Sequence, residues 1–502
     1  MKFAKILSLF LALLMLLSVF AACGNKPAET TPDNSKVTDP TDNNGRDEIK
    51  DTVPTDLKYN NETVTFLVRD GSNMNMYELA CEELLNDPLY DAIHYRNIDV
   101  EQRLGVKIQS DTRPGGFENY QAWNEAFSVS VLNNTGDYDG CGFYLSTGTA
   151  LAKDGMFYNL LNLTNDEGGY LDLEKPWWNQ SMVDNLSVYG ALFFAGGSLT
   201  IQQASGGVCV FFNRDLFNEK FPDDTAAHLY QLVRDQKWTA DQMRYYVSNC
   251  WDDMNSNGMV DPGDVIGIKD LGSFAGQMDA WIYAMGLDIT EMDQYGEPVI
   301  ALFNSRTVPA YEKVRNIFNN NPGAMICTGE GHEASSLQNG NVLFYTQCLG
   351  YGADMKESTV DYGVLPIPKY DEEQEDYRTC FANSATTLGV ASNLSDDRAV
   401  MVSAVLELLS AESYKQVIPV YYETVLKGHY SKDAADAEMF DRILNSFVFS
   451  FGFAYSTMSL GGISGIFRKL TTDYDIQQTI DGNRDYWETQ LTDLLASLDA
   501  VS

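Results

Sequence analysis

Short apolar strands alternate with helices along almost all of the chain from residue 58 onward, and this alternation restricts the fold more than any other feature. The stretch ETVTFLVRD (62–70) is rich in β-branched residues and ends at Gly71, which predicts a first strand. In 87–109, apolar residues at helical spacing follow Pro88 and stop at Gly105, which predicts a helix and then a strand, VKIQ. Further strands are predicted within 128–144, 190–197, 206–217, 339–350 and 361–370, and strong helices within 396–418 and 437–449. This order predicts an α/β protein with mostly parallel sheets.

Length and charge limit the class of protein further. Residues 58–502 are too many for one ordinary hydrophobic core but enough for two lobes. The full chain has 34 Lys and Arg against 71 Asp and Glu, which gives a formal net charge of −37. Such a surface repels nucleic acid and anionic membranes, and no basic stripe counteracts the repulsion. The composition therefore argues against a nucleic-acid-binding protein.

The N-terminus has the pattern of a secretory signal peptide. Lys2 and Lys5 precede an apolar run over 6–20, and two small alanines lead to Cys23. A transmembrane anchor is the alternative, because the run approaches the minimum length of a membrane span. The ending SVFAACG resembles the lipobox of bacterial lipoproteins, although Phe20 stands where leucine is usual. The resemblance implies that 1–22 is removed and that Cys23 is lipidated as the first mature residue, which would anchor the protein on the extracellular face of the cell membrane.

Two further expectations come from the sequence. One concerns the segment that follows Cys23, and the other concerns the remaining cysteines. Residues 23–57 contain few apolar side chains and many Thr, Pro, Asp and Asn, which predicts a disordered linker between lipid and body. The remaining cysteines are scattered and most lie in apolar runs, which favours free thiols packed as small hydrophobic groups; a few disulfides are the alternative. These seven are Cys81, Cys141, Cys209, Cys250, Cys327, Cys348 and Cys380.

Several stretches, taken in order, resemble one known family. YRNIDVEQRLGVKI (95–108) resembles the family's first helix and second strand, and 136–160 resembles its strand, turn and helix around a Tyr-Asp pair. The remaining stretches with this similarity are 174–197, 209–221, 229–247, 362–377 and 419–443. The family is that of the extracellular solute-binding lipoproteins of ABC importers, of the carbohydrate-binding type found in Gram-positive bacteria. Each stretch is weak evidence alone, whereas their common order over most of the body is strong.

This resemblance implies a two-lobed, periplasmic-binding-protein-like fold of type II, in which each lobe is a mostly parallel sheet flanked by helices. It implies a monomer that closes about a hinge on its ligand and presents the closed form to the permease of an ABC transporter, without chemistry on the ligand. The segments implied are lobe 1 over 58–205, lobe 2 over 206–380, a return segment over 381–425 and a C-terminal helical region over 426–502 packed on lobe 2.

The stretch DDMNSNGMVDPGDVIG (252–267) predicts a calcium loop. Oxygen-bearing side chains occur at alternate positions around Gly258, which is the spacing of an EF-hand loop. The ligands are Asp253, Asn255, Asn257, Met259 through its carbonyl group, Asp261 and Asp264. Val260 would pack beneath the loop, and the last position carries Asp instead of the usual Glu, an ending that resembles dockerin-type loops. We expect a structural Ca²⁺ of weak affinity; an ordinary Asn/Gly-rich turn is the alternative.

Ligand-binding residues are predicted at the ends of strands, where the clefts of α/β proteins collect contacts. Sugars bind through aromatic faces and polar side chains. Tyr144 follows a predicted strand, and Trp281 lies in a stretch that resembles a second-lobe helix with a stacking aromatic group. The complete candidate set is Trp281, Tyr144, Tyr345, Gln347, Tyr351, Trp178 and Arg69.

Other functions remain open from the sequence. A secreted hydrolase would need a positioned acid–base pair, but GEGHEASS lacks zinc-protease spacing and Ser464 in GGISG is one place late for a nucleophile elbow. A surface glycan-capture protein without a permease, or a binding protein for peptides or other organic solutes, fits the same features. An oligosaccharide or sugar is the ligand that the resemblance favours.

Overall fold

The computed structural model describes residues 43–70, 76–270, 276–319, 321–326, 337–355, 358–470 and 474–502. The predicted signal peptide, Cys23 and most of the predicted linker lie outside these residues, as do Cys327 and His332. Residues 40–502 form one compact unit. Among the described residues, no helix combines the length and the apolar character that crossing a membrane requires.

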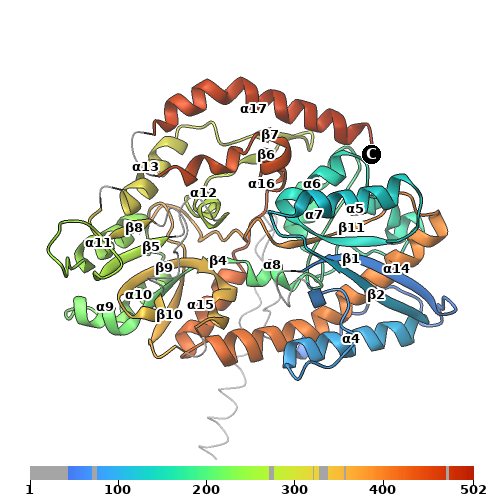
Figure 1. The fold of residues 1–502 in the computed structure, drawn as a ribbon, viewed down its shortest axis with the longest axis horizontal. Helices are drawn as coiled ribbons and strands as arrows, with labels where there is room; N and C mark the ends of the chain where they lie inside the picture. The colour runs from blue at the N-terminus through green and yellow to red at the C-terminus, as the bar shows by residue number, and fades with distance from the viewer. Residues whose placement is uncertain are drawn as a thin grey trace, which may run out of the picture. The chain divides into compact units, whose positions relative to one another are not determined.

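Lobe 1 is built on a four-stranded sheet of order β11-β3-β1-β2. Its strands are β1 (Glu62–Arg69), β2 (Val106–Arg113), β3 (Gly140–Tyr144) and β11 (Thr386–Val390). β1 pairs in parallel with β2 and β3, whereas β11 returns from the second lobe and pairs antiparallel with β3. Helix α4 (Pro88–Leu104) lies on one side of this sheet, and α5 (Tyr120–Leu132) and α6 (Leu145–Lys153) lie on the other (Figure 1).

The first helix–strand unit forms where the sequence places its caps. The Asp87 side chain accepts hydrogen bonds from the backbone N–H groups of Leu89 and Tyr90, and Pro88 occupies the first helical turn. Gly105 ends α4 in the left-handed conformation, with φ of 63°, which costs glycine little. The prediction for 87–109 is therefore confirmed, as are the strand over 62–69 and the helix over 396–412.

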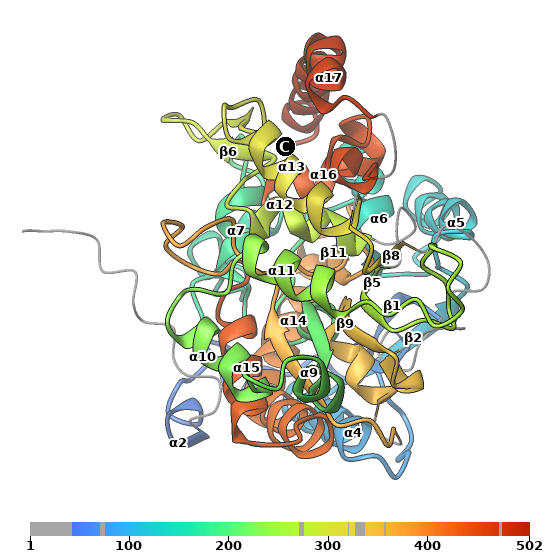
Figure 2. The same ribbon diagram turned by 90° about the vertical axis from the view of Figure 1, so that its left-hand side faces the viewer.

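Lobe 2 is built on a five-stranded sheet of order β10-β4-β9-β5-β8. Its strands are β4 (Val208–Asn213), β5 (Ile266–Asp270), β8 (Ala324–Ile326), β9 (Val342–Cys348) and β10 (Tyr362–Pro366). β5 is parallel to β8 and β9, but β4 is antiparallel to both β9 and β10. The sheet is thus mixed, because β4 enters directly from lobe 1. Figure 2, which looks onto lobe 2, shows α11 (Ala240–Cys250) beside the sheet, where it packs on β5 and β9.

Three connections join the lobes. The first contains α8 (Ile201–Ser205) and leads into β4, and the second runs from β10 to β11 through residues 367–385. The third is a continuous helical path made of α14 (Asp396–Glu412) and two π-helical segments, η8 (Ser413–Val417) and η9 (Val420–Tyr430). It carries the chain from lobe 1 back to α15 (Ala434–Leu444), which packs on β10.

The C-terminal helices contact both lobes. Helix α16 (Phe451–Ser459) packs against α6 of lobe 1, and α17 (Ile476–Asp499) contacts both α6 and α13 (Thr307–Phe318) of lobe 2. The remaining elements are α2 (Asn43–Arg46), α7 (Gln180–Leu186), α9 (Arg214–Lys220), α10 (Ala226–Arg234), α12 (Ala280–Ala284), β6 (Thr290–Met292), β7 (Pro298–Ile300), η1 (Leu160–Leu163), η2 (Asn165–Glu167), η4 (Gly276–Asp279), η6 (Leu337–Asn339), η7 (Leu349–Ala353) and η10 (Ile463–Arg468).

Two predictions from the sequence are wrong in detail. Residues 190–197 do not form a strand: Ala191 and Ala195 make only isolated bridges, because the segment is buried by side-chain packing instead of by a sheet. The predicted linker extends too far, because residues near its C-terminal end pack on the body. Arg46 is buried against the Tyr414 ring and donates to the Tyr414 carbonyl group, and Val53 joins the core.

Candidate functional site

The connections between the lobes enclose a cavity of about 270 Å³. Gln202 and Ser205 reach it from α8 in the first connection, and Ser384 reaches it from the second. Gln347 and Tyr351 reach it from the end of β9 and from η7. Its other lining residues are Gly206, Cys348, Gly350, Asp354, Ala382 and Ala385. A cavity lined by the first and second connections and by a strand of lobe 2 changes shape when the lobes rotate, so its location suits a hinge-closing protein.

On the lobe 2 side, Gln347 is held in a fixed orientation. Its Oε1 atom accepts hydrogen bonds from Gln277 Nε2 at 2.9 Å and from the Cys348 backbone N–H at 2.8 Å. Gln347 also lines the cavity, and none of the described residues accepts a hydrogen bond from its Nε2 atom. Behind it, the rings of Tyr345 and Tyr351 meet edge to face with centroids 5.1 Å apart, and Tyr345 is buried.

On the lobe 1 side, Arg69 and Tyr144 lie together at the ends of β1 and β3. The Arg69 guanidinium group donates to Gln202 Oε1 at 3.0 Å and to the Ser384 carbonyl oxygen at 2.8 Å. It lies 5.0 Å from the centroid of the Tyr144 ring, within the range of a cation–π contact. The Tyr144 hydroxyl group donates to Asn383 Oδ1 at 3.5 Å. Both side chains are thus attached to the connections that line the cavity.

A buried carboxylate compensates the charge of Arg69. Glu78 is 1% exposed and accepts a hydrogen bond from the Gln202 backbone N–H at 2.6 Å. Burial raises the pKa of Glu78 to about 7, although Arg69 and Arg96 act to lower it. Burial lowers the pKa of Arg69 to about 10, while the Glu78 charge acts to raise it. The positive charge at the base of the cavity is therefore partly neutralised within the protein.

A second arginine near Tyr144 is also neutralised. Arg468, at the end of η10, makes two hydrogen bonds to Asp279: its Nε and one terminal nitrogen lie 2.6 and 2.5 Å from the two carboxylate oxygens. Ser464 Oγ adds a third bond to this carboxylate at 2.9 Å. Burial raises the pKa of Tyr144, whereas the charges of Arg69 and Arg468 act to lower it. Tyr144 thus lies between two arginines, each with its own buried carboxylate.

The structure gathers some of the predicted ligand residues at this junction and not others. Gln347 and Tyr351 line the cavity, Tyr345 packs behind it, and Arg69 and Tyr144 adjoin it. Trp281 instead lies in the core of lobe 2, fully buried, with its ring centroid 5.4 Å from that of Phe318. Trp178 lies in the core of lobe 1, where its indole N–H donates to Glu407 at 2.9 Å. Neither tryptophan is accessible to a ligand in this conformation.

Sequence patterns did not reveal several residues of the junction. Gln202 and Ser205 lie on a five-residue helix, Gln277 lies beside a strand end, and Asn383 and Ser384 lie in an irregular connection. None of these positions follows a strand pattern or a motif. Only their attachment to Arg69, Tyr144 and Gln347 in the folded protein identifies them.

A larger hollow of about 730 Å³ lies on the surface of lobe 2, but it is a poorer candidate. It is lined by Thr239, Asp241, Gln242, Tyr245, Asp371, Glu372 and Glu373. All of these belong to lobe 2, so rotation of the lobes would not close the hollow on a ligand. Four of the seven side chains are carboxylates, which would repel anionic solutes. The cavity at the junction is therefore the better candidate for a site that lobe rotation could close.

The loop over 253–264 folds as a closed turn, in which side-chain oxygens accept hydrogen bonds from its own backbone. Asp253 accepts from the N–H groups of Asn257 and Gly258, and Gly258 has φ of +75°. Asp264 is fully buried and accepts from the N–H groups of Met254 and Asp261 at 3.0 and 3.1 Å. In the described part of the chain, no basic side chain forms an ion pair with Asp264.

The same loop fits a calcium ion through a mixed set of oxygens. Across the described residues, no three His, Cys, Asp or Glu side chains are grouped so that they could hold a metal by themselves. Calcium would therefore need the amide oxygens of Asn255 and Asn257 and the Met259 carbonyl beside the three aspartates. The Asn255 and Asn257 amides both donate to Asp261 Oδ2, which shows that these side chains converge. The buried, cation-free Asp264 is the observation that supports the fit.

Comparison with known proteins gives a fold but no close relative. No protein-family model and no curated protein matches the chain. UgpB from Mycobacterium tuberculosis, solved in complex with glycerophosphocholine, has a TM-score of 0.54 and 12% identity, covering 86% of this chain and 98% of its own. An ABC substrate-binding protein from Listeria monocytogenes, solved with cycloalternan, has a TM-score of 0.50 and 12% identity, covering 88% and 98%.

A third solved structure extends the same similarity. The maltose/maltodextrin-binding domain MalE from Bdellovibrio bacteriovorus, bound to maltotriose, has a TM-score of 0.50 and 11% identity, covering 87% of this chain and 99% of its own. At such identities the similarity establishes the fold. The chain has the two-lobed α/β fold of these substrate-binding proteins over nearly all of its compact unit, and the predicted fold class is confirmed.

Proposed function

We propose that this chain, which has the fold of ABC substrate-binding proteins, captures a sugar or oligosaccharide outside the cell and delivers it to an ABC permease. The protein binds its ligand and does not transform it. The site is the cavity between the lobes, with Gln347 and Tyr351 on one side and Arg69 and Tyr144 on the other. The ligand's contacts with both lobes would stabilise the closed form over the open form.

One observation supports the choice of ligand: the cavity is lined by polar groups, and the arginines beside it lie near buried carboxylates that offset their charge in part or in full. Arg468 is bound by Asp279, and Arg69 lies in the field of Glu78. What remains for a ligand are amide and hydroxyl groups, together with the carboxylate of Asp354. These groups donate to and accept from hydroxyl groups, whereas an anionic ligand would find no uncompensated cation among them. A neutral polyhydroxylated solute fits this surface best.

A thermal-shift panel tests the proposal. A soluble form that begins at residue 40, where the compact unit begins, would be mixed separately with sugars of one to four units, polyols, short peptides and organic phosphates. A ligand present at 100 times its dissociation constant adds about 2.7 kcal/mol of stability, which gives a visible shift of the melting temperature. We expect a shift with a neutral sugar, which is then recovered unchanged. A shift with peptides or phosphates alone, or consumption of the sugar, would contradict the proposal.

We further propose that the loop over 253–264 binds a structural Ca²⁺ through Asp253, Asn255, Asn257, Met259, Asp261 and Asp264. A bound divalent cation would supply positive charge to Asp264, which forms no ion pair with a basic side chain among the described residues. Support comes from the convergent side chains and from the burial of Asp264. The loop would stiffen lobe 2 and take no part in ligand binding.

Membrane attachment completes the proposal. We propose that Cys23 is lipidated and that it holds a monomeric binding body at the outer face of the cell membrane, which the SVFAACG sequence supports. Replacement of Cys23 by alanine should then release the protein from the membrane fraction into the medium. Mass spectrometry of the membrane-bound form should show a mature chain that begins at Cys23 and carries added lipid. An unmodified chain that stays bound through residues 6–20 would instead indicate a transmembrane anchor.

A further inference from the structure

An exposed aromatic side chain lies beside the proposed site. Phe117 is 56% exposed and lies in the segment between β2 and α5. Its ring centroid lies 5.8 Å from that of Tyr120 and 6.5 Å from that of Tyr144, with interplanar angles of 40° and 58°. We call Phe117, Tyr120 and Tyr144 the aromatic shelf. The three rings come from a loop, the start of a helix and the end of a strand, and Tyr144 adjoins the cavity.

The backbone beside Phe117 is held in a fixed position. Gly115 is buried, and a Cβ atom at this position would lie 2.6 Å from Arg69 Cγ and 2.8 Å from Trp123 Cδ1. Because glycine has no Cβ atom, the loop can lie close to Arg69, which adjoins the cavity. On the other side of Phe117, the backbone N–H of Asn119 donates to the Gly116 carbonyl oxygen at 2.9 Å. The loop is therefore preorganised, which lowers the entropy cost of binding through Phe117.

The shelf is continuous with the cavity. Tyr144 donates to Asn383, whose neighbours Ala382 and Ser384 line the cavity wall. Arg69 joins the two parts, because it contacts the Tyr144 ring and donates to the Ser384 carbonyl oxygen. A ligand longer than the cavity would extend along this wall onto the shelf. The cavity offers hydrogen-bonding groups, whereas the shelf offers aromatic rings that suit the C–H face of a sugar.

From this continuity we infer that the aromatic shelf is a second subsite, and that the ligand is an oligosaccharide of at least two units. One unit binds in the cavity through hydrogen bonds, and the next unit covers Phe117. This inference rests on the proposed function, because it assigns the shelf to the same ligand. Phe117 is then a residue that determines the length of the bound ligand.

The test measures affinity as a function of chain length in the soluble form that begins at residue 40. Isothermal titration would use the maltose, cellobiose and xylobiose series. Each series would include the monosaccharide and the sugars of two to four units. The variants are Phe117→Ala, Phe117→Trp and, as a matched control, Tyr245→Ala. Tyr245 is 57% exposed but lies on α11, outside the junction. Both positions are on the surface, so each of the three variants should fold.

In the unmodified protein, we expect affinity to rise by about ten-fold when a second unit is added, because that unit covers the Phe117 ring. Phe117→Ala should abolish most of this rise and leave monosaccharide binding unchanged, while Phe117→Trp and Tyr245→Ala retain it. If Phe117→Ala and the unmodified protein bind sugars of every chain length with equal affinity, the aromatic shelf is not a subsite. The proposed function would then still stand. The same conclusions would follow if monosaccharides bound as tightly as longer sugars. Binding of no sugar in any series would overturn the proposed function and this inference with it.

Discussion

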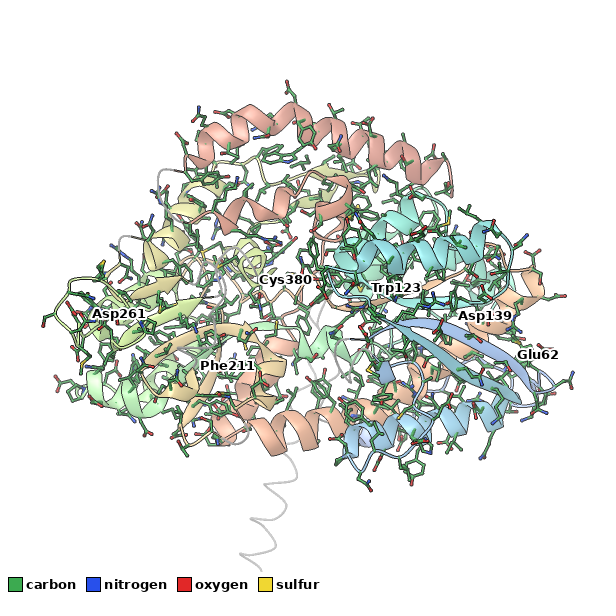
Figure 3. The ribbon with its side chains drawn as sticks, in the orientation of Figure 1. Glu62, Trp123, Asp139, Phe211, Asp261 and Cys380 are labelled. Atoms are coloured by element: carbon green, nitrogen blue, oxygen red, sulfur yellow. The ribbon has the colours of Figure 1, made fainter. Side chains whose placement is uncertain are left out.

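Two regions of this protein contain clusters of polar side chains. They differ in whether their charged side chains lie near groups of opposite charge. At the junction, Arg468 is held by Asp279 and Arg69 lies near Glu78, so each cation has a buried carboxylate. In the loop over 253–264, three aspartates turn inward and, among the described residues, no basic side chain pairs with the buried Asp264. Figure 3 shows Asp261 at the outer edge of lobe 2, whereas Cys380 lies near the junction.

The difference indicates what each region binds. Charges that are compensated inside the protein leave a neutral polar surface, which suits a ligand recognised through hydrogen bonds. A buried carboxylate that has only N–H donors and no basic partner among the described residues would be stabilised by a cation from outside, since a buried charge without an opposite charge is costly. We therefore propose a neutral organic solute for the junction and a metal ion for the loop. The first three predictions test whether charge is compensated where we place it, and the last concerns a buried indole group.

Removal of Arg468 should have the largest effect. The variant Arg468→Ala leaves Asp279 buried at 1% exposure without its bidentate partner. Loss of one member of such a pair typically costs 3–5 kcal/mol, so we expect the free energy of unfolding to fall by about 4 kcal/mol. Urea denaturation measures this change.

The matched control is Arg113→Ala. Arg113 pairs with Asp111, and the two side chains are 47% and 38% exposed, so removal of Arg113 should change stability by less than about 1 kcal/mol. Equal effects of the two variants would mean that the Arg468–Asp279 pair is not the compensated site that we describe.

Glu407 provides a third arrangement, a buried carboxylate held only by N–H donors. It accepts from the indole groups of Trp177 and Trp178 and from the Asp172 backbone. Burial raises the pKa of Glu407 to about 8, above the value of an unfolded chain. Its contribution to stability is complete below the unfolded pKa and is lost as pH rises toward 8. The stability difference between the unmodified protein and Glu407→Gln should fall by about 3 kcal/mol between pH 5 and pH 8.

Glu438 is the control, because its pKa is shifted in the opposite direction from that of Glu407. Hydrogen bonds from Arg234, together with Arg442, lower the pKa of Glu438. Its contribution is present above the unfolded pKa and is lost only as the pH falls below it. Glu438→Gln should therefore show no change relative to the unmodified protein between pH 5 and pH 8. A slope in that range for Glu438→Gln, or none for Glu407→Gln, would contradict the assignment.

Calcium removal should have a smaller effect. At a free calcium concentration ~30 times the dissociation constant, the ion would add about 2 kcal/mol, which a chelator should remove. Asp264→Asn should abolish the calcium-dependent part of the melting temperature, whereas Asp223→Asn, an exposed aspartate of lobe 2, should keep it. The readout is the difference with and without calcium, because Asp264 also caps backbone N–H groups and its loss destabilises the loop directly. If the chelator leaves the melting temperature unchanged, the loop does not bind calcium and is an ordinary turn.

Most of the fold was predictable because its local patterns are strong. The helix over 88–104 has an aspartate cap, an early proline and a terminal glycine, and the strands over 62–69 and 342–348 are rich in β-branched and aromatic residues. The segment 190–197 shows where such patterns fail. Its apolar run is as strong as that of a strand, but neighbouring side chains bury it and the backbone pairs at isolated bridges. An apolar run indicates that a segment is buried. Burial alone does not determine whether the backbone of that segment pairs with a neighbouring strand.

The site was less predictable, for a related reason. Tyr144, Gln347 and Arg69 lie at strand ends, so their positions followed from the strands. Phe117, Gln202 and Ser384 lie in loops or a short helix whose placement depends on contacts far along the chain. Large aromatic residues misled the prediction most, because a tryptophan suits a core and a sugar site equally well. Nothing in the sequence separates Trp281 from Tyr144, whereas their exposure in the folded chain does.

The smallest effect should come from Trp281 itself. The Trp281 indole N–H is buried and has no hydrogen-bond partner among the described residues. Trp281→Phe would remove this unsatisfied donor, which relieves about 1–3 kcal/mol, but would leave a cavity that costs a similar amount. The net change in stability should therefore stay below about 1 kcal/mol, and the affinity for the ligand should not change. Trp178→Phe provides the contrast, because it deprives Glu407 of a donor and gains no such relief. If Trp281→Phe instead lowered ligand affinity at unchanged stability, the tryptophan would have to turn into the junction when the lobes close, and the binding surface would extend into lobe 2.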